Sequence, residues 1–459
     1  MIDDTIAAIS TPIGASGIGI VRISGKEALA VAEKVFRSKK HKLLAEARNH
    51  SMLYGHVLDN NGDTVDEVLV SIMRGPHSFT AEDVVEINCH GGVVAVRKTL
   101  EAVLKAGARP ADPGEFSKRA FLNGRVDLAQ AESIIDLINA KTEKSLKVAV
   151  KQLEGALSGI VKKISDEMLE LLAHIEVGID FPEHDIEEVS RSIIEQKAKI
   201  ILNELRQMIE SAGTGKVFRE GLSTAIIGKP NVGKSSLLNA LLREKRAIVT
   251  DIPGTTRDVI EEIVNIKGIP LKLIDTAGIR ETEDVVEKLG VQKTKEVFNE
   301  ADLILLMFDA STGLTVDDRL LMPLVEGKSC LVIINKTDVT GDIDFSEIEK
   351  YLGPKDIIEM SLLDGRGLDK LEQRIEEIVY AGMGSGQEDI LVTNIRHQNA
   401  LERAYQSIGD LLRALEDGMP TDCMAIDLKA AREYLGEITG ETIGEDLVNQ
   451  IFSRFCIGK

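Results

Sequence analysis

The sequence has 459 residues, 43% of them hydrophobic and 28% charged, which is typical of globular proteins and leaves room for two or three domains. Its net charge is −20, it contains no Trp, and Tyr and Phe are few. It therefore lacks the overall basic charge and the stacking side chains of a chain that binds RNA by itself. A nucleic-acid substrate would need local basic patches or a partner.

The start of the sequence has no basic region followed by an apolar core, and no apolar run reaches 18 residues. We expect neither a signal peptide nor a membrane span. The cysteines are scattered and form no C-x-x-C pair, which favours a reducing, cytoplasmic location over a zinc site. They are Cys89, Cys330, Cys423 and Cys456.

Residues 1–120 predict a small α/β domain, in which a Gly-rich turn at 14–19 leads into a strand. Arg22 and Glu86 each lie inside an apolar strand, where a charge usually faces solvent. The other expected elements are strands at 68–72 and 84–87 and a helix at 93–104.

From about residue 122 the apolar residues recur at steps of three and four, which indicates helices. A stripe from Leu153 to Ile175 predicts one long helix that packs in a core or against another helix. More helix is expected at 189–211, and the Gly-containing stretch 211–215 is expected to be a linker.

The helical pattern returns near the end of the sequence, after a second Gly-rich stretch at 381–386. The simplest interpretation is a nucleotide-binding domain inserted into a helical domain whose two halves pack together. The predicted domains are 1–120, 121–218 as the first helical half, 219–380 as the inserted domain, and 381–459 as the second helical half.

A phosphate-binding loop of the form G-x-x-x-x-G-K-S spans residues 228–235, between an apolar strand and the start of a helix. These flanks disfavour the alternative of a chance Gly-rich turn. Lys234 is expected to reach the β- and γ-phosphates of a nucleotide, and the Ser235 hydroxyl to bind Mg²⁺. The contacts expected from this segment are Asn231, Val232, Gly233, Lys234, Ser235 and Ser236.

Three further motifs, each after an apolar run, identify the nucleotide as GTP or GDP. The carboxylate of Asp338 can accept both the ring N–H and the exocyclic amine of guanine, a pair that adenine does not offer. Ser361 is expected to close over the base, and Gly278 to approach the γ-phosphate. The motif residues are Asp275, Thr276, Ala277 and Gly278, then Asn335, Lys336 and Asp338, then Ser361.

Four motifs in this order resemble the TRAFAC-type GTPases, with a Ras-like α/β fold. Over its whole length the sequence resembles the MnmE (TrmE) family of tRNA-modification GTPases. The matching stretches are T-P at 11–12, G-I-V-R-I-S-G at 19–25, D-V-V-E at 83–86, H-G-G at 90–92, P-G-E-F-S at 113–117, R-A-F-L-N at 119–123, D-L-A-Q-A-E at 127–132 and F-C-I-G-K at 455–459.

The resemblance implies a homodimer formed through the N-terminal domain, which would bind 5-formyl- or 5,10-methylene-tetrahydrofolate. The folate contacts carry over onto Arg22, Glu86, Arg125 and Lys459. Position 125 is often Lys in relatives, and Arg keeps the charge but not the geometry. The residue types suit the ligand, because a pterin edge pairs with a carboxylate and the folate carboxylates pair with cations.

The resemblance also implies a partner, the flavoprotein GidA (MnmG), in a heterotetramer that acts on tRNA. Together the two proteins would add an aminomethyl or carboxymethylaminomethyl group at C5 of the wobble uridine, position 34. Cys456 is a candidate nucleophile in this chemistry. The alternative is that Cys456 is a small buried residue.

The mechanism of hydrolysis needs a group that orients water. Many small GTPases place a Gln after the glycine of D-x-x-G, but Ile279 stands there and its side chain cannot hydrogen-bond water. The spacing leaves the acids of 281–287 open, among them Glu283 and Asp284, and the resemblance points to Glu287.

The resemblance further implies K⁺, bound when two GTPase domains meet, in place of an arginine finger. Its ligands would be oxygens of Asn231, Thr250, Ile252 and Thr255. Asn231 has the alternative role of shaping the loop only. Thr256 would be the second protein ligand of Mg²⁺.

Two other functions compete with this one. A ribosome-assembly GTPase would usually carry a basic G-x-x-G module or a second GTPase unit, and neither is visible. A regulatory module, in which GTP turnover only changes the conformation of a complex, overlaps with the first interpretation.

Overall fold

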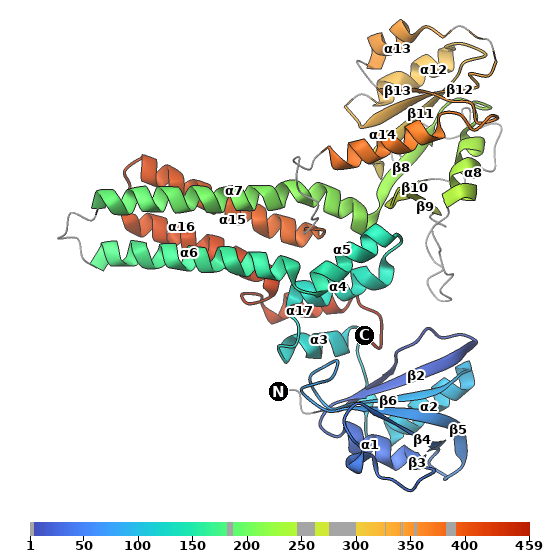
Figure 1. The fold of residues 1–459 in the computed structure, drawn as a ribbon, viewed down its shortest axis with the longest axis vertical. Helices are drawn as coiled ribbons and strands as arrows, with labels where there is room; N and C mark the ends of the chain where they lie inside the picture. The colour runs from blue at the N-terminus through green and yellow to red at the C-terminus, as the bar shows by residue number, and fades with distance from the viewer. Residues whose placement is uncertain are drawn as a thin grey trace.

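A computed structural model describes residues 4–180, 187–245, 262–274, 300–325, 327–339, 341, 343–352, 356–381 and 392–459. The molecule is elongated, with an N-terminal α/β domain at one end, a second α/β domain at the other, and a helical domain that projects sideways between them (Figure 1). The expected multidomain architecture, with an α/β domain inserted into a helical one, is confirmed. In the part of the chain so described, no helix is long and apolar enough to cross a membrane.

The N-terminal domain is built on a seven-stranded sheet in the order β3-β4-β5-β6-β2-β1-β7. Neighbouring strands are antiparallel except β1 and β7. Helices α1 and α2 both contact β2 and β6, so they cover the same face. The elements are β1 (Ile6–Ile9), β2 (Ser16–Ser24), α1 (Ala28–Val35), β3 (Phe36–Ser38), the short 3₁₀ helix Leu44–Glu46, β4 (Ser51–Leu58), β5 (Thr64–Met73), β6 (Val84–Gly91), α2 (Val93–Lys105) and β7 (Arg109–Pro110).

Alternation along the two central strands decides which face each charge takes. Val21 and Ile23 of β2 are buried in the core under the helices, as are Val85 and Ile87 of β6. Because side chains alternate along a strand, the intervening Arg22 and Glu86 point to the opposite face. The two strands pair in register, with Arg22 directly across from Glu86.

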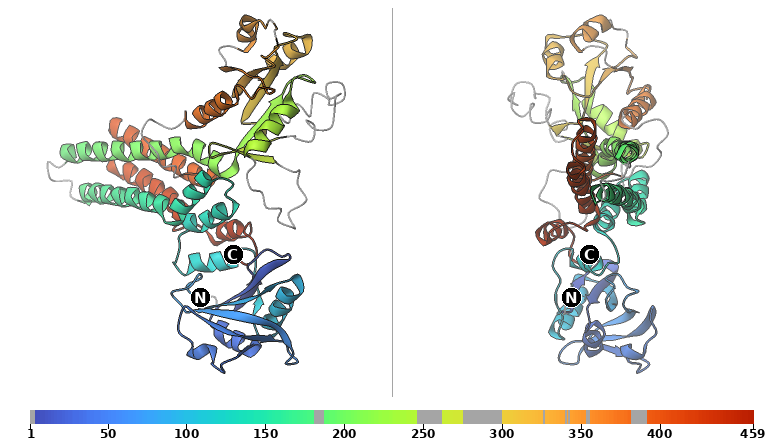
Figure 2. Two further views of the ribbon diagram at one scale, coloured as in Figure 1. Left: turned by 45° about the vertical axis from the view of Figure 1, so that its right-hand side comes forward. Right: turned by 90° about the vertical axis from the view of Figure 1, so that its left-hand side faces the viewer.

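The helical domain contains a bundle of four long helices, α6, α7, α15 and α16, which we call the helical arm; seen end-on, the four pack side by side (Figure 2). Its core is a continuous set of buried apolar residues from both halves of the chain. The elements are α3 (Glu115–Leu122), α4 (Leu128–Asn139), α5 (Glu143–Leu153), α6 (Ala156–Asp180), α7 (Glu187–Glu220), α15 (Ile395–Glu416), α16 (Thr421–Thr439) and α17 (Glu445–Phe452).

The single long helix expected from Leu153 onward is wrong at its start. Leu153 ends α5, and α6 begins only at Ala156. Gly155 has φ +89°, a left-handed conformation that ends a helix and is open to glycine. Helix α3 spans the expected boundary at residue 120, and its buried Arg119 donates to Asp4 Oδ1 at 2.6 Å and to Glu115 Oε1 at 2.9 Å.

The inserted domain has a six-stranded sheet in the order β13-β12-β11-β8-β10-β9. All neighbouring strands are parallel except β9 and β10. The elements are β8 (Leu222–Ile227), α8 (Lys234–Lys245), β9 (Glu262–Ile266), β10 (Ile269–Leu273), β11 (Leu303–Asp309), α12 (Val316–Leu321), the 3₁₀ helix Met322–Val325, β12 (Cys330–Asn335), α13 (Phe345–Leu352), β13 (Asp356–Glu359) and α14 (Leu368–Tyr380).

The linker expected at 211–215 is wrong, because α7 runs through it to Glu220. One of its glycines, Gly215, is needed for a close contact instead. A Cβ on Gly215 would lie 1.8 Å from the carbonyl oxygen of Val392, so only glycine lets the returning chain pass this close. Beside it, the Thr214 hydroxyl donates to the carbonyl of Val379 at 2.9 Å. The chain thus enters and leaves the inserted domain at one place.

Candidate functional site

The phosphate-binding loop lies between β8 and α8, and its shape depends on two left-handed residues. Asn231 has φ +62° and Gly233 has φ +111°. A Cβ on Gly233 would lie 2.2 Å from Asn335 Nδ2, so the loop can pass this side chain only with a glycine. Helix α8 starts at Lys234, and the N–H of Leu237 donates to the carbonyl of Gly233 at 2.9 Å. The helix N-terminus therefore opens onto the loop, as a phosphate requires.

The side chains of this loop divide between its interior and solvent. Lys234 Nζ donates to the carbonyls of Gly228 at 2.6 Å and Lys229 at 2.8 Å, and burial lowers its pKa. Asn231, Ser235 and Ser236 are exposed, whereas Val232 is buried. The exposed groups are placed where a nucleotide phosphate and its cation can reach them.

A buried ion pair ties the loop to the next part of the domain. Lys229 Nζ lies 2.9 Å from Asp318 Oδ2 and donates to the Thr312 hydroxyl at 2.8 Å. The same Asp318 oxygen accepts from the backbone N–H of Thr315 at 2.9 Å, at the start of α12. The sequence analysis did not single out Lys229 or Asp318; a cation inside the motif was the available signal.

The guanine side of the site is assembled at the ends of β12 and β13. Asn335 Nδ2 donates to the carbonyl of Val232 at 2.8 Å, which joins this motif to the phosphate-binding loop. Lys336, at φ +63°, donates to Asp309 Oδ2 at 2.6 Å. The Ser361 hydroxyl donates to Asp338 Oδ1 at 2.7 Å and lowers the pKa of this carboxyl.

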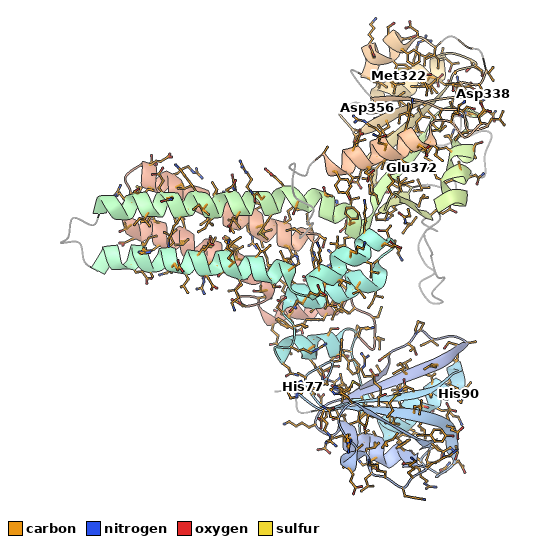
Figure 3. All side chains as sticks on the ribbon, viewed as in Figure 1. His77, His90, Met322, Asp338, Asp356 and Glu372 are labelled. Atoms are coloured by element: carbon orange, nitrogen blue, oxygen red, sulfur yellow. The ribbon has the colours of Figure 1, made fainter. Side chains whose placement is uncertain are left out.

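Asp338 lies at the margin of the inserted domain, exposed at the end of its sheet (Figure 3). The structure therefore brings together the two halves of the predicted nucleotide site that it describes, namely the phosphate-binding loop and the guanine motifs. The switch segments lie outside the described residues. These are Thr250, Ile252, Thr255, Thr256, Asp275, Thr276, Ala277, Gly278, Ile279, Glu283, Asp284 and Glu287.

A second cluster gathers the residues expected to bind folate on the N-terminal sheet, on the face away from α1 and α2. Arg22 Nε donates to Glu86 Oε1 at 2.8 Å. The Arg22 guanidinium lies 4.9 Å from the ring centre of Phe79 and 5.6 Å from that of Phe116. These aromatic contacts, which the sequence analysis did not foresee, hold the cation in one orientation.

The segment 456–459 reaches this cluster from the far end of the sequence. Arg22 NH1 donates to the carbonyl of Gly458 at 3.2 Å, and the Ser10 hydroxyl donates to the same oxygen at 3.1 Å. Burial, and the nearby charge of Arg22, lower the pKa of Lys459. Cys456 is exposed, so the alternative of a buried cysteine is wrong.

Arg125 joins the cluster through Phe79. Its NH1 donates to the carbonyl of Phe79 at 2.6 Å, and its guanidinium lies 5.1 Å from the same ring centre. Burial lowers the pKa of Arg125. Phe79 is thus stacked near both Arg22 and Arg125, and the structure brings together all four residues expected to bind folate.

The hydrogen-bonding and charged groups of this cluster fit a reduced folate. Glu86 uses Oε1 for Arg22, and among the described residues no partner is assigned to its Oε2. A free carboxylate oxygen can accept from the pterin edge. Arg125 and Lys459 supply cations for carboxylates, as folate binding requires.

Comparison with known proteins gives matches over the whole chain. A profile for the MnmE helical domain matches residues 128–456, and one for the N-terminus of the GTP-binding protein TrmE matches residues 5–125. The tRNA modification GTPase MnmE of Alkaliphilus metalliredigens is 55% identical over 459 residues, covering 100% of both chains. The protein of the same name from Clostridioides difficile is 51% identical over 458 residues, covering 100% of this chain and 100% of its own.

Among solved structures, a G domain matches about a third of the chain. The G domain of the FeoB iron transporter of T. maritima is 28% identical, with a TM-score of 0.25, and the match covers 34% of this chain and 97% of that one.

Proposed function

The chain belongs to the MnmE family of tRNA modification GTPases, and we propose that it hydrolyses GTP while helping to modify the wobble uridine of certain tRNAs. The observation that carries this proposal is the pairing of two separate sites in one chain. One joins a phosphate-binding loop to Asp338 and Ser361, and the other joins Arg22 and Glu86 to the 456–459 segment.

In the proposed reaction, a flavoprotein partner of the GidA (MnmG) type forms a heterotetramer with a homodimer of this chain in the cytoplasm. The complex adds an aminomethyl or carboxymethylaminomethyl group at C5 of uridine 34. The one-carbon unit comes from 5-formyl- or 5,10-methylene-tetrahydrofolate, which the N-terminal cluster would hold.

We assign the nucleotide site as follows. The N–H groups at the start of α8 and the Lys234 ammonium bind the phosphates and stabilise negative charge that develops on them. Asp338 accepts the two guanine N–H groups, with the Ser361 hydroxyl holding it in place. Mg²⁺ would be held by Ser235 and Thr256 and would neutralise phosphate charge. Glu287 orients the attacking water, since Ile279 cannot.

K⁺ is proposed as a second cation, which would offset charge between the β- and γ-phosphates. Asn231, Thr250, Ile252 and Thr255 would hold it when two GTPase domains pair. Asn231 supports this role because its side chain is exposed and its left-handed backbone places it at the turn of the loop.

The cation role is tested by GTP turnover of the full chain in matched KCl and NaCl. We expect faster turnover in K⁺, and we expect Asn231→Ala to abolish this difference while GTP binding persists. Glu287→Ala is the matched variant, because it should keep K⁺-dependent pairing but lose about 10²-fold in turnover. Equal rates in the two salts for the unmodified protein would refute the role of K⁺.

The folate site has Arg22 and Glu86 at its centre, with Arg125 and Lys459 at its edges. Glu86 would hold the pterin edge through Oε2, and the two outer cations would hold the carboxylates of the folate tail. The folate supplies the one-carbon unit when bound. The thiol of Cys456 is exposed, three residues before Lys459, and is proposed as the nucleophile.

Folate binding is measured by calorimetry on the full chain, beside GDP binding as a control. Glu86→Ala should weaken folate binding at least tenfold, because the pterin N–H groups lose their acceptor, and should leave GDP binding unchanged. Cys456→Ser should bind folate normally but fail to support tRNA modification. A Glu86→Ala protein with folate affinity within about twofold of the parent would remove Glu86 from the site.

The modification itself is tested by mass spectrometry of tRNA from a strain that lacks this gene. We expect unmodified uridine at position 34, restored by the unmodified gene and not by Glu287→Ala. A fully modified uridine at position 34 in the deletion strain would contradict the proposed function.

A further inference from the structure

The charge of the chain is divided unequally between its domains. Residues 1–120 carry 15 Lys and Arg and 15 Asp and Glu, so the N-terminal domain is neutral. The remaining residues carry 40 basic and 60 acidic side chains, and therefore the whole net charge of −20. An RNA that approaches this chain is repelled by most of its surface and least by the N-terminal domain.

Within that domain one segment of 14 residues carries five of the 15 basic side chains. We call residues 37–50, which include most of β3 and the turn that leads to β4, the basic loop. Its side chains Arg37, Lys40, Lys42 and Arg48 are all exposed. No hydrogen bond or ion pair of these four side chains occurs within the ranges that the structure describes.

Neighbouring lysines show that cations elsewhere on this surface do have partners. Lys39 donates to Glu67 Oε1 at 2.6 Å, and Lys34 donates to the carbonyl of Ala106 at the end of α2 at 2.9 Å. Cations that have a local structural task are therefore paired. The four side chains of the basic loop stay available for a ligand from outside.

The basic loop is anchored to the domain. Leu44 is fully buried in the core, and its N–H donates to Glu33 Oε2 at 2.6 Å. Arg74 NH2 donates to the carbonyl of Ala45 at 2.7 Å. The backbone of the loop is therefore held in place without the four cations, which project from a fixed support. A ligand that binds them has little backbone to order.

One end of the basic loop connects to the proposed one-carbon site. His50 Nε2 donates to the carbonyl of His77 at 2.9 Å. His77 lies on the side of the N-terminal domain that faces α3 (Figure 3), two residues before Phe79, which stacks near Arg22 and Arg125. One end of the basic loop thus lies beside the segment that carries Phe79.

We propose that the basic loop binds the phosphate backbone of tRNA. The inference rests on the proposed function for the identity of the RNA. Unpaired cations on a fixed loop suit phosphates, which carry charge at regular intervals but no sequence information. Contacts of this kind position an RNA and leave the choice of base to other groups.

The alternative occupant on this surface is the acidic part of a second copy of the chain. If the basic loops of two copies met each other at a two-fold axis, their like charges would repel. Contact between a basic loop and an acidic region of the second copy is the competing arrangement. The experiment separates RNA binding from self-association directly.

The test compares tRNA affinity of the full chain at several salt concentrations, using the triple variant Lys40→Gln, Lys42→Gln and Arg48→Gln. The matched control replaces three exposed cations of α2 in the same domain, as Arg97→Gln, Lys98→Gln and Lys105→Gln. We expect the first triple to weaken tRNA binding about tenfold or more near 0.1 M salt. For this triple, the slope of log affinity against log salt concentration should become less negative by about 2 to 3. The control triple should have the slope of the parent.

GTP turnover and folate binding of both variants report that the domains are folded, and neither should change. Parental tRNA affinity and salt dependence in the basic-loop triple would overturn the inference, as would equal losses in the two triples. A triple that loses self-association in sedimentation but keeps tRNA binding would assign the loop to a second copy instead. An unmodified chain that binds no tRNA also overturns the inference. The proposed function would survive that result, because a partner can hold the tRNA while the wobble uridine is still modified.

Discussion

At the scale of single residues, guanine recognition depends on one carboxylate and the hydroxyl that orients it. Asp338 is exposed, yet Ser361 donates to it at 2.7 Å from the end of another strand. Ser361 is itself fully buried, so its position is set by the domain core and not by the ligand. The acceptor is thereby aimed before a nucleotide arrives.

Replacement of Asp338 by Asn tests this arrangement. The amide N–H₂ group can donate to the added carbonyl of xanthine but cannot accept from guanine. We expect GTP affinity to fall about 10²-fold and xanthosine triphosphate affinity to rise, both measured by calorimetry. Asp364→Asn, a nearby acid that pairs with Arg366, is the control and should leave both affinities unchanged. Unaltered GTP affinity in Asp338→Asn would contradict the assignment.

A second residue-scale feature is the buried carboxylate of Glu132 in α4. It accepts from Arg396 NH2 at 2.6 Å, from His397 Nε2 at 2.7 Å and from Asn394 Nδ2 at 3.1 Å, all near the start of α15. Burial raises the pKa of Glu132, but the hydrogen bond from His397 and the charge of Arg396 outweigh it and lower the pKa to about 2.

This lowered pKa predicts a loss of stability in acid. A carboxyl with a lowered folded-state pKa stabilises the protein above its unfolded value of about 4.3, and the contribution disappears as the pH falls toward about 2. The lowered pKa of Glu132 contributes about 3 kcal/mol to the free energy of unfolding near neutral pH. Glu132→Gln should therefore unfold more easily than the parent near neutral pH, and the difference should shrink in acid. The urea midpoints of the parent and Glu132→Gln are compared at pH values of about 6 and 3. The same difference between the two proteins at both pH values would contradict the prediction.

At the scale of elements, the sequence predicted strands and helices where their periodicity is strong, and it failed at glycines. The strands around Arg22 and Glu86 and the helix after residue 93 were found because apolar residues mark one face. Gly213 and Gly215 were interpreted as a linker, because composition does not reveal whether a glycine serves flexibility or a close contact. That distinction depends on Val392, far along the chain, which no local pattern reveals.

The two glycines of α7 make a matched pair for a test. Gly215→Ala places a Cβ against the Val392 carbonyl and should destabilise the helical domain by about 2 kcal/mol. Gly213 is exposed in the same helix with nothing near its Cβ, so Gly213→Ala should stabilise by about 0.5 to 1 kcal/mol. Thermal unfolding midpoints of the two variants should move in opposite directions. A drop in both, of similar size, would show that this part of α7 needs flexibility after all.

At the scale of the whole molecule, the insertion of one α/β domain into a helical domain was predictable, because the motifs and the change of periodicity mark it. The folate cluster was predictable only by family resemblance. Composition and spacing cannot bring Gly458 to Arg22, which lies 436 residues away. Phe79 and Phe116 were missed because their rings meet the Arg22 guanidinium only in the folded chain, and no local pattern marks them.

The position of the 456–459 segment against the N-terminal domain can be tested without removing any side chain proposed to bind folate. Gly458 has φ +90°, and a Cβ there would lie 2.2 Å from the carbonyl of Ile9, so Gly458→Ala should displace Lys459 and weaken folate binding at least tenfold. Gly444→Ala is the control, with nothing near its Cβ. Calorimetry should show normal GDP binding for both. Parental folate affinity in Gly458→Ala would place Lys459 outside the site.

The long reach of the 456–459 segment has a consequence for biosynthesis. The N-terminal domain leaves the ribosome first and can fold early, but its proposed one-carbon site gains Gly458 and Lys459 only after the 339 residues that follow residue 120 have been translated. At usual elongation rates this takes on the order of tens of seconds. During that time the apolar residues of α6 and α7 that pack against α15 and α16 are not yet covered by them. A nascent chain released a few codons early would keep its GTPase domain and would lack the contacts that close the one-carbon site.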